Sequence, residues 1–259
     1  MFTTIRRVVL TGVVAVLAGA QAWAVTPIAS CPFTISASGN YIVTADLLTC
    51  AGDGIDINAS NVTVNLNGHI ITGSATVLGT GIAVNTSGSP RLNHIGISGP
   101  GLIESFGGGI FIQNSDYVQV SQTTVAGNIF GGVGGENVTY LTVGGNVIVA
   151  NGSPYNPPYP TVDTFGLLLL QSTGVQVTGN QVVGNRGDGI VLQSGDSNTL
   201  TGNVASGNAG SGILMGDTSF FDSQTTAPLT NSRVSSNTTN GNLWVGIGVE
   251  SPTRACSHY

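Results

Sequence analysis

Short runs of alternating apolar and polar residues recur along most of this chain. Each run covers three to five positions with a period of two, which is typical of β-strands, and no long segment has the 3.6-residue period of a helix. The clearest copies are GDGIVL from Gly187 and GSGILM from Gly210, which lie 23 residues apart. Related runs are GDGIDI from Gly52, GTGIAV from Gly79, GGGIFI from Gly107 and FGLLLL from Phe165. This repetition predicts one structural unit that is used many times.

A single short strand cannot bury its apolar side, but strands repeated at a fixed spacing can stack and cover one another. We expect the strands to run parallel, ~4.8 Å apart. Within GIVL, Ile190 and Leu192 point to one side and Val191 to the other. Stacking then predicts one interior column, made of Ile55, Ile82, Ile110, Leu167, Ile190 and Ile213.

Asparagines repeat at the same interval as the apolar runs. One set is Asn146, Asn180, Asn203 and Asn237, and a second is Asn128, Asn151, Asn185, Asn208 and Asn242. A stacked asparagine can hydrogen-bond its neighbours above and below, and it tolerates a left-handed backbone. We therefore expect two asparagine ladders, and His69, which aligns with the first set, is expected to end that ladder.

The pattern GI.L..S…VTGN….GN resembles the right-handed parallel β-helix repeat proteins, a pectin-lyase-like superfamily with carbohydrate-binding and sugar-hydrolase repeats. The resemblance covers residues 31–250. It implies an all-β fold, a single-stranded right-handed parallel β-helix (a solenoid) of about eight coils. The superfamily contains lyases, hydrolases, epimerases, adhesins and phage tail proteins, so the fold does not fix the reaction.

The N-terminus has the features of a signal peptide. Arg6 and Arg7 precede an apolar run over residues 8–20, and Ala22-Trp23-Ala24 is a small-x-small cleavage site. We expect cleavage near Ala24 and a secreted or periplasmic mature chain, and both Sec and twin-arginine export stay open. Residues 25–259 then form a single β-helix domain, with loop insertions near 151–163 and 216–228.

Export permits disulfides, and three cysteines remain in the mature chain. Cys31 and Cys50 flank a segment that reads as two short strands with a turn at Gly39-Asn40. We predict a Cys31–Cys50 bridge that staples the first element, which leaves the role of Cys256 open.

The charge balance limits the partners. The chain has six arginines, no lysine and twelve carboxylates, for a formal charge of −6 that becomes −8 without Arg6 and Arg7. This composition has no electrostatic footprint for nucleic acid, and we expect no membrane partner for the mature chain. The oligomeric state is left open.

The resemblance implies that an enzyme of this type works on the outside of the first strand stack. The outward column there is Asp56, Ala83, Phe111, Leu168, Val191 and Leu214, and the next is Asn58, Asn85, Gln113, Leu170, Gln193 and Gly216. Asp56 is then the one carboxylate on this face. Glycoside hydrolysis normally requires two carboxyl groups about 5 to 9 Å apart, and a uronate lyase requires a base and a cation. The apolar outward patch indicates a covering segment or a partner.

The best charged cluster lies at the edge of this face. Asp163 and Arg186 are 23 residues apart and should stack on adjacent coils, and Asp188 follows closely. Arg186 could hold a sugar carboxylate and one aspartate could move a proton, while Tyr155 and Tyr159 could stack on a sugar ring. The alternative, which the residue types favour, is an exposed ion pair with Asp188 capping a turn.

The residues show no transition-metal spacing, and we expect no cofactor. Asp196, Asp217 and Asp222 could share a Ca²⁺ ion with loop carbonyls, although acids in such turns are more often solvated.

Three functions fit these observations. The first is a protein that binds or modifies an extracellular or cell-envelope polysaccharide; a catalytic member would be a polysaccharide lyase, glycoside hydrolase or epimerase. The second is a non-catalytic surface or adhesive module, which the missing carboxylate pair favours. The third is a periplasmic accessory protein, against which the lack of metal ligands argues. Catalysis is undecided at this level.

Overall fold

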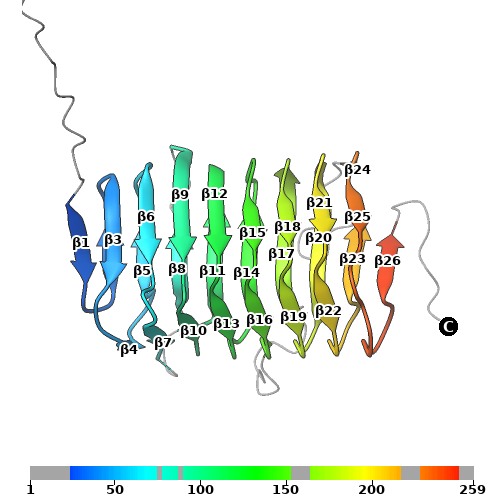
Figure 1. Ribbon diagram of the computed structural model, residues 1–259, viewed down its shortest axis with the longest axis horizontal. Coiled ribbons are helices and arrows are strands. Elements are labelled where there is room, and N and C mark those ends of the chain that lie inside the picture. Colours follow the sequence, from blue (N-terminus) through cyan, green and yellow to red (C-terminus); the bar gives the residue numbers. More distant parts are fainter. Residues whose placement is uncertain (1–23, 75–77, 87–89, 153–163, 217–227, 251–259) are drawn as a thin grey trace, which may run out of the picture.

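A computed structural model describes residues 24–74, 78–86, 90–152, 164–216 and 228–250, and in this part of the chain all strands pair in parallel. They form three sheets that share one interior, so the molecule is a parallel β-helix (Figure 1). Each strand pairs with the equivalent strand of the next coil. Nearly all of the predicted signal segment lies outside the described residues, as do most of both predicted insertions.

The first sheet has nine strands. They are β1 (Val25–Ile28), β3 (Gly39–Val43), β6 (Val62–Asn65), β9 (Leu92–Ser98), β12 (Ser115–Ser121), β15 (Thr142–Gly144), β18 (Gln176–Thr178), β21 (Thr199–Thr201) and β25 (Arg233–Ser235). The seven-stranded sheet consists of β4 (Leu47–Cys50), β7 (Ile70–Gly73), β10 (Leu102–Glu104), β13 (Thr124–Ala126), β16 (Val147–Val149), β19 (Gln181–Val183) and β22 (Val204–Ser206).

The ten-stranded sheet contains the Gly-x-Gly runs. Its strands are β2 (Phe33–Ile35), β5 (Ile55–Ile57), β8 (Thr80–Val84), β11 (Gly108–Gln113), β14 (Gly131–Glu136), β17 (Phe165–Thr173), β20 (Asp188–Asp196), β23 (Ile213–Gly216), β26 (Ile247–Glu250) and β24 (Leu229–Thr230), which pairs with β20. None of the described residues forms a helix that could span a lipid bilayer.

The predicted interior column is confirmed. Its members pair coil by coil, and Ile190 lies opposite Ile213 in the parallel register of β20 and β23. Val133, from the glycine-rich strand β14, fills the rung between Ile110 and Leu167. All of these side chains are 0–1% exposed. The period of the sequence therefore translates directly into a continuous apolar core.

Both asparagine ladders are present. Except in the last member of each ladder, the side-chain amide donates from Nδ2 to the Oδ1 of the asparagine in the next coil at 2.9–3.1 Å. It also donates to a backbone carbonyl of the preceding coil, as Asn151 does to Val125. The expected left-handed backbone is wrong for the asparagines themselves. The residue before them takes positive φ instead, as Gly184 (φ 64°) and Ala150 (φ 55°) do. Glycine suits this position because it has no Cβ to oppose the turn.

The ladder of Asn146 ends differently from the prediction. Thr123 occupies the next coil and donates to Asn146 Oδ1 from its backbone nitrogen at 3.0 Å. The His69 side chain instead lies 3.0 Å from Asp46, measured from Nδ1 to Oδ1. His69 is thus part of a surface pair and not of the ladder.

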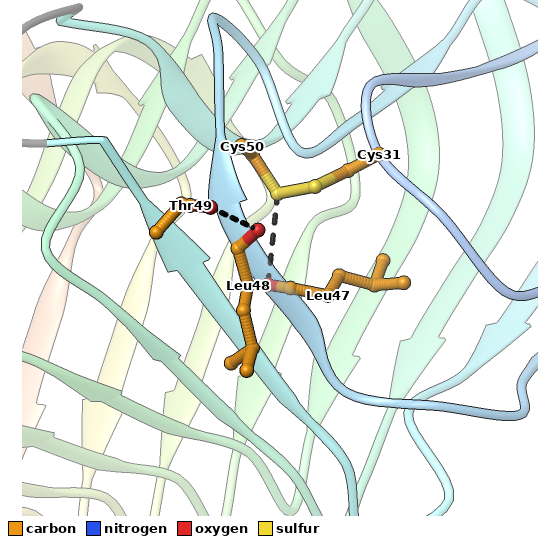
Figure 2. Close-up of a disulfide and its surroundings, with 5 residues drawn as sticks. All are labelled: Cys31, Leu47, Leu48, Thr49 and Cys50. Carbon is orange, nitrogen blue, oxygen red and sulfur yellow. Dashed lines mark hydrogen bonds between the residues drawn. A yellow bond between two sulfur atoms is a disulfide. The ribbon is translucent and has the colours of Figure 1, made fainter.

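The Cys31–Cys50 disulfide is confirmed, with a Cα–Cα distance of 5.4 Å (Figure 2). The expected turn at Gly39-Asn40 is wrong, because both residues belong to β3. The segment between the cysteines is one complete coil with a strand in each of the three sheets. The bridge therefore closes the first coil onto itself.

Candidate functional site

The outer face of the ten-stranded sheet has the predicted column, with Gly134 added between Phe111 and Leu168. Its C-terminal half is covered: Leu168, Val191 and Leu214 are only 3–5% exposed and form an apolar cluster separate from the core. Phe165 and Leu170 pack at the margin of this cluster. Before β17, Ala83 and Gly134 are buried as well, and Asp56 and Phe111 are the partly exposed members of the column. The accessible part of this column therefore lies in the coils before β17.

Two aromatic rings lie over glycine positions on this open part. The ring of Phe111 occupies the space above Gly134, and the ring of Phe165 occupies the space above Gly131, where a Cβ would collide with each ring. Both phenylalanines are half-buried, so part of each ring faces solvent. The glycine-rich strand β14 thus presents neighbouring aromatic rings in place of side chains of its own.

A carboxylate stands beside these rings that the sequence reasoning missed. Glu136 pairs in register with Gln113, and the Gln113 Nε2 donates to Glu136 Oε2 at 2.9 Å. The expectation that Asp56 is the one carboxylate on this face is therefore wrong. The four glycines of GGVGGE conceal the alternation of its strand, and aligning GGVGGE with GGIFIQ places Glu136 opposite Gln113.

One further residue was assigned to the wrong side of the sheet. Asn85 is 2% exposed, takes a positive φ of 54°, and donates from Nδ2 to the carbonyls of Pro90 and Asn114. It shapes a turn and does not belong to the outward column.

Asp56 lies in a partly desolvated position on the same face. Burial raises the pKa of its carboxyl, while a 2.7 Å hydrogen bond from Asn58 Nδ2 to Oδ2 acts in the opposite direction. Its Oδ1 is buried and has no hydrogen-bond partner within the described part of the chain. The rung of Asp56 lies three strands from that of Glu136, about 14 Å at the spacing of parallel strands. This exceeds the roughly 5 to 9.5 Å that separates the carboxyls of glycoside hydrolases.

Of the predicted charged cluster, Arg186 and Asp188 are described, whereas Asp163, Tyr155 and Tyr159 lie outside the described residues. Asp188 is 3% exposed, and its Oδ1 accepts a hydrogen bond from the Ser211 backbone nitrogen at 2.5 Å. Arg186 is exposed and lies two residues before Asp188, the first residue of β20.

The Asp188 contact has a counterpart earlier in the chain. Asp53, at the same place in GDGIDI, accepts from the Thr80 backbone nitrogen at 2.6 Å. The repeated contact supports a turn-capping role for Asp188. The catalytic roles of Asp163, Arg186 and Asp188 stay predictions.

The calcium hypothesis also stays a prediction, because Asp217 and Asp222 fall outside the described residues. Asp196 is described, and its oxygens accept hydrogen bonds from Thr230, Asn231 and Ser197 at 2.6–2.8 Å. These bonds lower the pKa of its carboxyl. Within the described ranges, no three His, Cys, Asp or Glu side chains come close enough to hold a metal ion.

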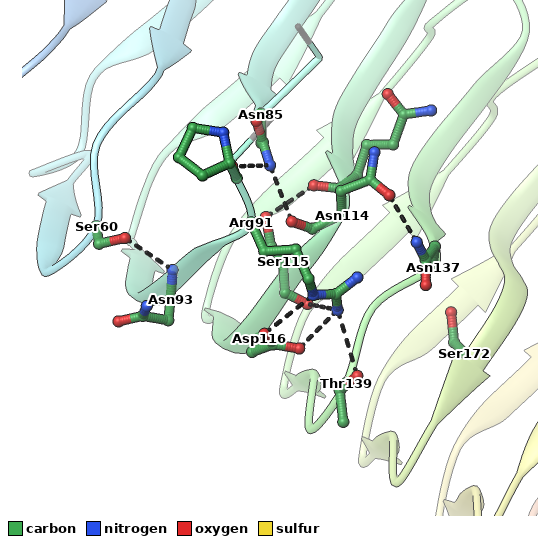
Figure 3. A network of polar contacts seen from close by, with 12 residues as sticks. Ser60, Asn85, Arg91, Asn93, Asn114, Ser115, Asp116, Asn137, Thr139 and Ser172 are labelled. Atoms are coloured by element: carbon green, nitrogen blue, oxygen red, sulfur yellow. Dashed lines mark hydrogen bonds and ion pairs between the residues drawn. The ribbon is translucent and has the colours of Figure 1, made fainter. Parts of the chain in front are cut away.

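A polar network crosses three coils beside the N-terminal ends of β9, β12 and β15, in the middle of the nine-stranded sheet (Figure 3). Arg91 binds Asp116 through two bonds, from Nη2 to Oδ1 at 2.6 Å and from Nε to Oδ2 at 3.1 Å, and its Nη2 also donates to Thr139 Oγ1 at 3.3 Å. The hydrogen bonds from Arg91 lower the pKa of the Asp116 carboxyl. The network links three successive coils through side-chain hydrogen bonds. It lies next to the aromatic residues His94, Tyr117 and Tyr140 in the sequence.

A family model for the right-handed beta helix region matches residues 80–251, which is 172 of 259 residues. This chain belongs to the right-handed β-helix family. No curated protein matches the sequence of this chain.

Solved structures resemble the β-helix at low sequence identity. A mutant of the periplasmic alginate epimerase AlgG is 18% identical, with a TM-score of 0.57 over 82% of this chain and 50% of its own. The A-module of the mannuronan C-5 epimerase AlgE6 of Azotobacter vinelandii is 15% identical, with a TM-score of 0.54 over 83% of this chain and 58% of its own.

A tailspike mutant of the E. coli bacteriophage HK620, in complex with a pentasaccharide, is 15% identical, with a TM-score of 0.57 over 90% of this chain and 41% of its own. The β-helix thus spans roughly half the length of these neighbours. At these identities, the likeness establishes the shared fold.

Proposed function

We propose that this β-helix binds an extracellular or cell-envelope polysaccharide along the open part of its ten-stranded sheet. The observation that carries the proposal is the pair of half-buried rings, Phe111 and Phe165, lying over Gly134 and Gly131 beside the Glu136–Gln113 pair. The weakly positive C–H groups of a sugar pack well on the negative face of an aromatic ring. A carboxylate and an amide next to the ring can bind the sugar hydroxyls.

Two further observations support this proposal. The neighbours of the same fold include epimerases named for alginate and mannuronan and a tailspike with a bound pentasaccharide. The disulfide Cys31–Cys50 and the predicted signal segment favour a location outside the cytoplasm.

The binding test uses two variants on the face and one control. Purified protein is passed over immobilised dextran, xylan, alginate and polygalacturonate, and retention is measured. We expect Phe111→Ala and Glu136→Gln to weaken retention about tenfold, which corresponds to the loss of ~1.4 kcal/mol. Gln119→Ala, an exposed change on the nine-stranded sheet, should stay within about twofold of the wild type. Retention of both site variants at the level of Gln119→Ala, or no retention of the wild type, would contradict the proposal.

Modification of the bound chain is the second part of the proposal and depends on the exposed Arg186 at the edge of the same sheet. The test follows new reducing ends, unsaturated ends and uronate epimers after incubation with the same glycans. We expect Arg186→Ala and Asp163→Asn to abolish any product that the wild type forms. Unchanged product in both variants would remove these residues from the catalytic assignment.

A further inference from the structure

Three aromatic rings stack on one another at an exposed edge of the nine-stranded sheet. His94 and Tyr117 have ring centroids 5.1 Å apart with planes at 15°, and Tyr117 and Tyr140 have centroids 5.0 Å apart with planes at 20°. Tyr117 and Tyr140 are 52% and 53% exposed. The three residues follow each other at 23-residue intervals, so the repeat itself aligns them.

The backbone at this place is unusual for aromatic residues. His94, Tyr117 and Tyr140 have φ values of 56°, 54° and 56°. In other coils the equivalent position also has positive φ and holds Asn61 (57°), Gly174 (68°), Ser197 (57°) or Asn231 (49°). Asparagine and glycine suit this left-handed region, whereas bulky residues there are strained. The left-handed turn is thus a feature of the repeat, and three successive coils place an aromatic residue at it.

The two ends of the stack have different surroundings. The far face of Tyr140 lies over Gly174, where a Cβ would come within 2.9 Å of the ring. His94 at the other end borders a shallow pocket of about 390 Å³. The pocket therefore lies at the His94 end of the stack, where the preceding coil holds Asn61 in place of a fourth ring.

The other residues that line the pocket carry small polar groups. They are Ser38, Gly39, Asn40, Asn61 and Thr63. Thr63 Oγ1 donates to Asn40 Oδ1 at 2.6 Å, so the two side chains are held together at the pocket. The His94 ring is held by a 2.8 Å contact between its Nδ1 and Asn93 Oδ1.

We propose that this pocket binds one neutral sugar residue of a glycan, packed against the exposed His94 ring beside Asn61 at the end of the ring column. Asn40, Asn61 and Thr63 bind its hydroxyl groups. Neutral sugars are specified because the lining has no arginine or carboxylate, and the guanidinium of the nearby Arg91 is already bound by Asp116. The inference extends the proposed polysaccharide binding to a second sheet and names the class of sugar bound there.

The test replaces the ring at this position while keeping its backbone. In His94→Asn the new side chain tolerates positive φ but offers no aromatic face, and His94→Tyr restores a ring. Titration calorimetry and NMR shifts are measured with dextran-, cello-, laminari- and xylo-oligosaccharides, and with oligogalacturonate as the acidic probe. We expect His94→Asn to bind the best neutral probe at least tenfold more weakly, and His94→Tyr to stay within about threefold of the wild type.

Tyr140→Asn is the matched control, because it shortens the stack at the end away from the pocket. It should bind within about twofold of the wild type. Equal binding by His94→Asn and the wild type, preference for oligogalacturonate, or no binding of any neutral probe would overturn the inference. Weakening by Phe111→Ala but not by His94→Asn would overturn the pocket alone and leave the proposed function standing.

Discussion

The two ends of the β-helix finish the same interior column in opposite ways. Ile35 in β2 and Val249 in β26 are the first and last members of a column that runs through Ile57, Ile112 and Leu192. Ile35 is 1% exposed, whereas Val249 is 71% exposed. Being in register with the column is therefore not enough to bury an apolar residue at its end; the end must also be covered.

At the N-terminal end, β1 precedes the first coil and adds Ile28 to the same buried cluster as Ile35. The preceding strand β1 pairs with β3 and buries Ile28, and the Cys31–Cys50 bridge ties the first coil together. In the last coil, Leu243 and Trp244 are 73% and 61% exposed. The comparison predicts that equivalent side-chain substitutions lower the free energy of unfolding more at the N-terminal end than at the C-terminal end.

The largest effect on stability is expected from shortening the side chain at the N-terminal end of the interior column, compared with the same change at its C-terminal end. Ile35→Ala removes a fully packed side chain and should lower the free energy of unfolding by about 4 kcal/mol. Val249→Ala changes a solvated side chain and should change it by less than about 0.5 kcal/mol. Urea unfolding followed by circular dichroism measures both values, and equal losses would show that the last coil is buried in solution.

Removal of the disulfide tests the closed end directly. Cys31→Ser together with Cys50→Ser frees a loop with a sequence separation of 19 residues, and should cost about 3 kcal/mol of unfolding free energy. Reduction of the wild type by dithiothreitol should have the same effect. Cys256→Ser serves as the control and should leave the unfolding curve unchanged. A double serine variant as stable as the oxidised wild type would refute the role of the bridge as an end staple.

The asparagine ladder extends the comparison from the middle of the solenoid to its open end. Asn185 is 1% exposed and bonds to Asn151, Asn208 and the Ile148 carbonyl, so Asn185→Ala should cost about 2 kcal/mol. Asn242 ends the ladder in a more exposed position, and Asn242→Ala should cost about 1 kcal/mol or less. Thermal and urea unfolding of the matched pair provides the measurement, and a larger loss for Asn242→Ala would reverse the proposed order.

The smallest effect on stability is expected from the exposed apolar residues of the last coil. Leu243→Ser with Trp244→Ser should change the free energy of unfolding by less than about 0.5 kcal/mol. The same change should reduce concentration-dependent light scattering, because large exposed apolar patches favour association. Scattering that matches the wild type at every concentration would argue that this coil is covered by other means.

Much of the coil architecture was predictable from the sequence. The 23-residue interval put Ile190 opposite Ile213 and Asn185 next to Asn208, because a side chain in a repeat meets its own equivalent one rung away. Glu136 was missed because the glycines of its strand concealed the alternating pattern. The stack of His94, Tyr117 and Tyr140 has the same 23-residue interval but was not predicted. These residues lie at turns, outside the alternating apolar pattern that identifies the strands.

By itself, the sequence determined the parallel stacking, the interior column, the asparagine ladders and the Cys31–Cys50 disulfide. All of these follow from periodicity and local spacing, since each coil contacts its neighbours in the same way. Only the tertiary structure decided which outward positions are covered, such as Leu168 and Val191, and which interior ones are exposed, such as Val249. Exposure depends on contacts that do not repeat and on where the stack of coils ends, and no periodic pattern encodes either.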